Sequence, residues 1–258
     1  MEFEKQSFSK KLKSMLKVDF KRTFTMPMVY ILAGVCLALP ILILVMTSMM
    51  TSVDPETGEA VKAFTSVWQI IGSASGAGMA MDLTGMCNIN LIYFLIAIAV
   101  CVFVSEDFKS GYAKNLFAVR SKKGDYVISK TLAGFTVGVI MVLAFFIGAM
   151  LGGAIAGLSF DAGAASAGGI VACVFSKIGL VFIYVAVGLL ASVIAKQKTW
   201  LSVLCAIAMG ALLFTMLPMM APLNASILNV IMCLGGGAIF GAGLGAVSGL
   251  VLKKSNLV

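Results

Sequence analysis

Long runs without a single charged side chain recur along the chain and alternate with short polar stretches. The uncharged runs cover residues 26–50, 83–104, 131–158, 178–195, 200–217 and 227–252. Because a helix rises about 1.5 Å per residue, the first two runs can cross a hydrocarbon core of about 30 Å, and the two shortest runs, of 18 residues, reach about 27 Å. A lone strand would leave its backbone groups unpaired in lipid. The pattern therefore predicts an all-α, polytopic membrane protein with six transmembrane helices.

The composition supports this interpretation, because 60% of the 258 residues are hydrophobic and only 12% are charged. One charged side chain at the centre of a bilayer costs about 2.5–3.5 kcal/mol on insertion scales. A chain with this balance is not a soluble globular domain. We expect a single transmembrane domain over residues 1–258, in the cell membrane.

The basic residues indicate an orientation. With six spans, seventeen of the nineteen lysine and arginine residues fall on one side, and only Lys62 and Lys177 fall on the other. Basic residues are retained on the cytoplasmic side, so both termini are predicted to be cytoplasmic. The retention of basic residues on the cytoplasmic side and their attraction to anionic lipid headgroups also account for the net charge of +8. We therefore expect membrane lipids and not nucleic acid as partners.

Two segments outside the spans have helical spacing. In the leader, residues 1–25, apolar side chains recur every fourth position from Phe8 to Phe20 and lysines occupy the remaining arc, which predicts an amphipathic helix at the membrane interface. In the external segment, residues 51–82, the apolar positions from Val61 to Ile71 predict a helix lying on the outer surface.

Catalytic and metal-binding chemistry is poorly represented. The chain has no histidine, its six cysteines form no C-x-x-C pair, and the six runs contain no carboxylate. It also lacks the G-x-x-x-x-G-K-[ST] phosphate loop. We therefore expect no enzyme activity, no metal and no cofactor on this chain. Lys177, at the margin of the fourth run, is expected to extend its ammonium group to the membrane surface.

The stretch "SEDFKSGYAKNLFAVRSKKGDYVISK", residues 105–130, is the main polar interruption after the leader. Within it Phe108, Tyr112 and Leu116 are spaced by four, which predicts a short helix with an aromatic and aliphatic face. Gly111 costs about 1 kcal/mol inside a helix, so it marks a helix boundary or a close approach. Such a segment either contacts a cytosolic partner or rests on lipid headgroups.

This stretch resembles the cytoplasmic loop of permeases of the ABC type-2 exporter family. In that loop an acidic pair is followed by F-x-S-G-x-x-K-N-L and by S-K at the start of the next span. The amphipathic leader and the external segment after the first span are also similar. The resemblance implies a coupling helix that docks on a separate ATP-binding subunit, with ATP and magnesium bound by that partner. The implied docking residues are Glu106, Asp107, Phe108, Gly111, Tyr112, Lys114, Asn115 and Leu116.

The resemblance also implies that the leader is a connecting helix and that two permease copies pair around an export path. An uncharged path in a chain with seventeen methionines suits a hydrophobic or amphipathic substrate such as a peptide, drug or lipid. Two other functions stay open at this point. One is an energy-independent channel or facilitator, and the other is an immunity protein that sequesters a ligand in the membrane.

Glycines are concentrated in the third and sixth runs. Small residues at intervals of four give a helix a flat face on which another helix can pack closely. The predicted packing residues are Gly148, Gly152, Gly237, Gly241, Gly245 and Gly249.

Overall fold

The computed structural model describes residues 8–49, 51–53, 60–62, 64–72, 88–119, 123–163, 165–214 and 220–254. Its α-helices are α1 (Phe8–Thr25), α2 (Pro27–Ser48), α4 (Ile92–Lys109), α5 (Tyr112–Val119), α6 (Lys123–Ala156), α7 (Ala167–Ala195), α8 (Thr199–Phe214) and α10 (Ile227–Lys254). Two short strands, β1 (Thr51–Val53) and β2 (Ala60–Lys62), pair in antiparallel fashion. The described part of the chain is thus almost entirely helical.

Five helical segments are long and apolar enough to cross a membrane. They are α2, α4 with the preceding 3₁₀ turn η2 (Ile89–Leu91), α6, α7 and α10. These spans identify a multi-pass membrane protein. The 16 residues of α8 reach only about 24 Å, less than a hydrocarbon core of about 30 Å. Residues 215–217 of the predicted fifth span lie outside the described residues.

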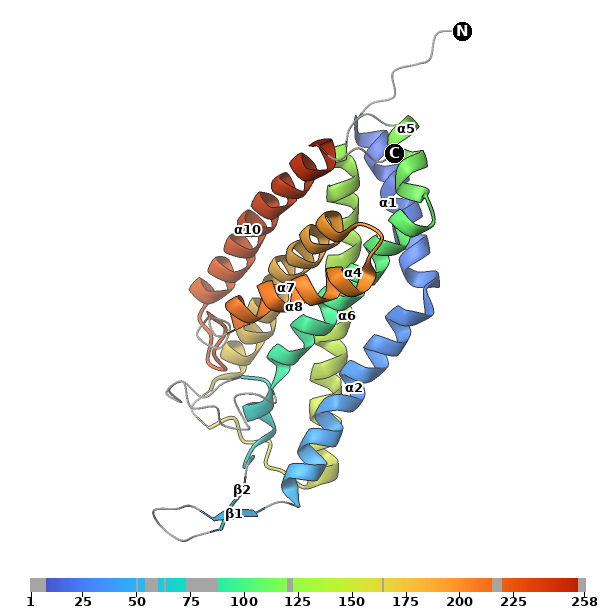
Figure 1. The fold of residues 1–258 in the computed structure, drawn as a ribbon. Coiled ribbons are helices and arrows are strands. Elements are labelled where there is room, and N and C mark those ends of the chain that lie inside the picture. The colour runs from blue at the N-terminus through green and yellow to red at the C-terminus, as the bar shows by residue number, and fades with distance from the viewer. Residues whose placement is uncertain are drawn as a thin grey trace.

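The bundle has two distinct ends (Figure 1). One end, here called the leader end, carries α1, α5 and the C-terminal end of α10. There the Lys123 ammonium group donates a 2.5 Å hydrogen bond to the Leu252 carbonyl, which joins α6 to α10. The opposite end, here called the hairpin end, carries β1 and β2. The start of α1 and the end of α10 therefore lie at the same end of the bundle.

The helices extend beyond the uncharged runs. α6 begins at Lys123 and not at residue 131, α4 continues to Lys109, and α7 begins at Ala167. Ser166 caps α7 by accepting a 3.0 Å hydrogen bond from the Gly169 N–H. The extensions contain polar side chains that form hydrogen bonds or ion pairs inside the protein. Hydropathy alone therefore placed the starts of α6 and α7 too late and the end of α4 too early.

The segment after β2 is not the predicted surface helix. Residues Val67–Ile70 form a short 3₁₀ helix, η1, which Ser66 caps by accepting from the Trp68 N–H. The indole N–H of Trp68 donates to the Phe160 carbonyl at 2.8 Å, and Ser66 forms a bridge with Ser159. The segment packs on the loop after α6, and these long-range contacts replace the helix that spacing predicted.

Glycines bring the long helices together. A Cβ atom at Gly148 would collide with the Leu37 carbonyl of α2, and one at Gly237 would collide with the Gly179 carbonyl of α7. At Gly249 the same atom would meet nothing within 4 Å. A Cβ atom would lie 2.7 Å from its nearest neighbour at Gly152, 3.5 Å at Gly241 and 3.3 Å at Gly245.

Candidate functional site

The polar stretch at residues 105–130 includes the end of α4 and the helix α5, which are joined by a sharp turn. α4 ends where the Ser110 N–H bonds to the Glu106 carbonyl at 2.9 Å. Gly111 follows with φ +73°, a left-handed conformation that glycine adopts without strain at the end of a helix. The Asn115 N–H then bonds to the Gly111 carbonyl at 3.0 Å, in the first turn of α5. Gly111 is therefore a helix boundary.

Four charged side chains meet where α1, α4 and α6 come together, and we call this cluster the leader-end junction. Lys130 Nζ lies 2.8 Å from Asp19 Oδ1 and 2.6 Å from Asp107 Oδ2. Arg22 Nη1 lies 2.7 Å from Asp107 Oδ1. Asp19, Asp107 and Lys130 are 0% exposed. Two acidic and two basic groups leave the junction with no net charge.

Hydroxyl groups complete the coordination of both carboxylates. Ser129 donates a 2.5 Å hydrogen bond to Asp19 Oδ2, and the Tyr126 hydroxyl donates a 3.0 Å hydrogen bond to Asp107 Oδ2. A buried ion pair is stable only when its remaining hydrogen-bonding capacity is also satisfied. Each carboxylate here has both a cation and a hydroxyl, although Arg22 Nη1 and Asp107 Oδ1 are joined by an ion pair without hydrogen-bond geometry.

Aromatic rings enclose the cations and attach α5 to the junction. Lys130 Nζ lies 3.8 Å from the centroid of the Phe103 ring, and the Arg22 guanidinium lies 4.2 Å from that of Tyr112. Phe117 of α5 packs edge-on against Tyr126, with 5.2 Å between ring centroids. Cation–π contacts of this kind contribute about 0.5–2 kcal/mol each. Movement of α5 is thus linked to α1 and α6.

Burial and charge both affect the pKa of Tyr112 and of Arg22. Burial raises the pKa of the Tyr112 phenol, and the carboxylates of Asp19 and Asp107 raise it further. For Arg22, burial disfavours the charged form, but the contact with Asp107 outweighs it and the guanidinium pKa is raised. Tyr112 is therefore neutral and Arg22 cationic at neutral pH.

The structure separates the eight predicted docking residues into three groups. Asp107 and Phe108 are buried, Gly111, Tyr112 and Leu116 are half-buried, and Glu106, Lys114 and Asn115 are exposed. The aromatic face of α5 points into the protein, and the opposite, polar face points outward.

The sequence analysis missed three members of the junction, namely Asp19, Arg22 and Lys130. One signal was present, because Asp19 is an acidic residue inside a leader otherwise dominated by lysine between positions 5 and 22. An acidic side chain there is better explained by a buried cation than by an interface. The apolar face of α1 indeed includes Met15, which is 3% exposed.

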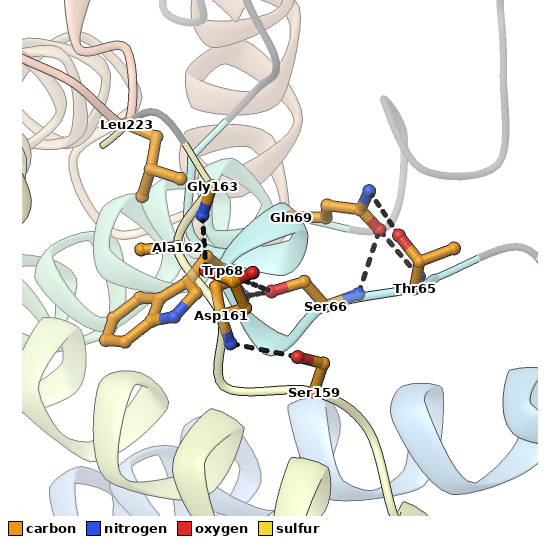
Figure 2. A pocket seen from close by; sticks show the side chains of 9 residues that line it. All are labelled: Thr65, Ser66, Trp68, Gln69, Ser159, Asp161, Ala162, Gly163 and Leu223. Carbon is orange, nitrogen blue, oxygen red and sulfur yellow. Dashed lines mark hydrogen bonds between the residues drawn. The ribbon is translucent and has the colours of Figure 1, made fainter.

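A cavity of about 320 Å³ opens at the hairpin end (Figure 2). Its polar side chains bond to their own loops: Asp161 Oδ1 accepts from the Gly163 N–H at 3.0 Å, and the Gln69 amide donates to Thr65 Oγ1 at 3.0 Å. These bonds stabilise the wall of the cavity. Among the described residues, no group of three or more histidine, cysteine or acidic side chains could hold a metal ion.

Lys177 of α7 does not extend to the membrane surface, so that prediction was wrong. Its side chain is 0% exposed, and Nζ donates a 2.8 Å hydrogen bond to Asn90 Oδ1. Nearby, the Tyr93 hydroxyl donates to the Lys177 carbonyl at 2.8 Å and joins α4 to α7. The ammonium group is held between helices inside the bundle.

No protein-family model matches the chain, and neither does any curated protein or solved structure. The functional interpretation therefore depends on the junction, the membrane spans and the motif in the loop.

Proposed function

We propose that the chain is the transmembrane permease subunit of an ATP-driven exporter. A second copy of the chain completes the path for a hydrophobic or amphipathic substrate, and a separate subunit binds ATP and magnesium. In this proposal six segments cross the cell membrane, with α8 as the fifth, and the leader end with both termini faces the cytoplasm. The junction fixes a short helix, α5, between two membrane spans, and this observation carries the proposal.

The junction gives α5 a mechanical connection to the bundle. The turn at Gly111 joins α5 directly to α4, and the rings of Tyr112 and Phe117 join it to α1 and α6. Removing one partner of a buried ion pair costs about 3–5 kcal/mol, so these helices resist separation. A force applied to α5 would displace α4 and α6 as rigid bodies, as in domain movements driven by nucleotide binding.

Of the eight predicted docking residues, Glu106, Lys114 and Asn115 have the exposed side chains that are available to an ATP-binding subunit. This surface is smaller and more polar than the one expected from the motif. Substitutions at Tyr112 or Leu116 would disturb the inward-facing side of α5 together with any docking. Lys114 and Asn115 therefore offer cleaner tests, because their side chains are exposed.

The decisive experiment places a photo-crosslinking amino acid at Lys114 in the tagged, full-length chain in its native membranes. Position 198 is the matched control, because the Lys198 side chain is also exposed. Lys198 directly precedes α8, which contacts α4 where the Ser202 hydroxyl lies 3.2 Å from that of Ser105. We expect an adduct at position 114 that is labelled by a photoreactive ATP analogue, and no such adduct at position 198. Lys114→Glu should reduce substrate-stimulated ATP hydrolysis by the purified complex while the unfolding midpoint stays unchanged.

Three results would contradict the proposal. The first is the absence of an ATP-binding adduct at position 114. The second is solute passage at full rate through liposomes that contain this chain alone, which would identify a channel or facilitator. The third is ligand binding that is indifferent to ATP and unaccompanied by transport, which would identify a sequestering protein.

A further inference from the structure

A second polar cluster lies apart from the junction, around the ammonium group of Lys177. It comprises Lys177 and Ser176 of α7 together with Asn90 of η2, and we call it the Lys177 cluster. The exposed fractions of these residues are 0%, 0% and 1%. The cluster lies deep in the part of the bundle where α4, preceded by η2, packs on α7.

The hydrogen bonding of the cluster is incomplete on the acceptor side. An ammonium group carries three N–H donors, and among the described residues Lys177 Nζ has one acceptor, the neutral Asn90 Oδ1 at 2.8 Å. Asn90 Nδ2 and Ser176 Oγ are buried, and neither has a hydrogen-bond partner among those residues. The cluster has donors in excess, so what it lacks is an acceptor.

The charge of Lys177 is also uncompensated within the described residues. The ion pairs found there all belong to the leader-end junction. An isolated charge in a low-dielectric interior is strongly unfavourable unless an opposite charge accompanies it. A negatively charged acceptor would satisfy both the free donors and the charge.

We propose that the Lys177 cluster binds a small anion of the size of chloride, held by Lys177 Nζ and Asn90 Nδ2. Because Nδ2 shares its amide carbon with Oδ1, it lies within a few ångströms of Nζ, and one anion can accept from both. The near-complete burial favours a small anion over a lipid headgroup or a peptide, which would need an opening to the surface. The inference is independent of the exporter proposal, since it concerns the resting protein without an ATP-binding partner.

The test uses the purified full-length chain in a neutral detergent. Thermal unfolding is measured in sodium chloride and in sodium gluconate at equal ionic strength. A ligand that binds only the folded state raises the unfolding midpoint in a saturable way. We expect that rise for the wild-type chain and for the control Lys198→Met, and we expect its loss in Lys177→Met.

A second variant keeps the proposal testable if Lys177→Met does not fold. Asn90→Asp places a carboxylate where an amide oxygen now lies 2.8 Å from Nζ, so the protein would carry its own counter-charge. We expect a higher unfolding midpoint in gluconate than for the wild type, and no further rise in chloride.

Two outcomes would overturn the proposal. The first is a full chloride response retained in Asn90→Asp. The second is a wild-type midpoint that is indifferent to chloride.

Discussion

Two lysines are wholly buried in this bundle, and their surroundings are opposite. Lys130 in α6 faces two carboxylates, whereas Lys177 in α7 faces a neutral amide oxygen among the described residues. Both ammonium groups are 0% exposed. The comparison shows that burial alone does not define the role of a charge. Lys130 joins helices through the carboxylates of Asp19 and Asp107, while Lys177 has no carboxylate partner in the part of the chain that the structure describes.

The supply of opposite charge explains why the two environments differ. Asp19 and Arg22 are three residues apart on α1, so they lie on one face of the helix and bring one charge of each sign. Asp107 completes the set near the end of α4. The leader end thus combines charges from three helices into a neutral cluster, which explains why it can hold α5 rigidly.

The largest expected difference is between the variants that remove Lys130 and Lys177. Lys130→Met leaves the buried carboxylates of Asp19 and Asp107 without their shared cation, so it should destabilise the protein by about 3–5 kcal/mol. Lys177→Met removes a charge that has no ion-pair partner among the described residues, and it should be neutral or stabilising in gluconate. Unfolding in a neutral detergent measures both. Equal losses of stability in the two variants would show that the environments do not differ as described.

A smaller change separates the two acidic neighbours at the end of α4. Asp107→Asn removes a carboxylate that forms ion pairs with Arg22 and Lys130 and accepts a hydrogen bond from Tyr126, and it should cost about 1.5–3 kcal/mol. Glu106→Gln is the matched control, because Glu106 is exposed and should leave the unfolding midpoint unchanged. If the two variants behave alike, Asp107 does not hold the junction together.

The sequence was sufficient to predict the class of protein and most of the spans. Charge-free runs directly reflect the cost of charge in lipid, so they located the helices that became α2, α4, α6, α7 and α10. They could not locate the helix ends. Charged residues such as Lys130 and Asp19 make a sequence resemble a loop. In the folded protein, however, their side chains form a buried ion pair inside the helical bundle.

The candidate site was predictable only in part, for a related reason. Spacing predicted the helical segment that became α5, and a helix boundary was one of the two explanations offered for Gly111. The structure places Phe108 on α4 and not on the same helix as Tyr112 and Leu116. The direction of the aromatic face of α5 depends on Arg22, which is 90 positions from Tyr112 and lies over its ring. No local pattern contains that contact, so Tyr112 was assigned to a surface and not to an internal junction.

A third prediction concerns the seam next to Lys177. Gly237→Ala would drive a methyl group into the Gly179 carbonyl, two residues along α7 from Lys177, and should cost about 1–3 kcal/mol. Gly249→Ala meets no neighbour within 4 Å and should stabilise α10 by up to about 1 kcal/mol. Thermal unfolding of both variants is the measurement. Equal effects would mean that close contact with α7 is not what requires glycine at position 237.

The smallest expected effect concerns the ring that joins α5 to the junction. Tyr112→Leu removes the face on which the Arg22 guanidinium rests, so it should destabilise the protein by about 0.5–1 kcal/mol. Hydrogen exchange in α5 should accelerate more than in α7, because the lost contact belongs to α5 alone.

Tyr112→Phe provides the control, because it keeps the aromatic ring and should retain nearly the full protection of α5. If Leu and Phe at position 112 give the same exchange rates, the ring does not transmit force between α5 and α1. The charges of the junction would then hold α1, α4 and α6 together without α5, and coupling would depend on the turn at Gly111 alone.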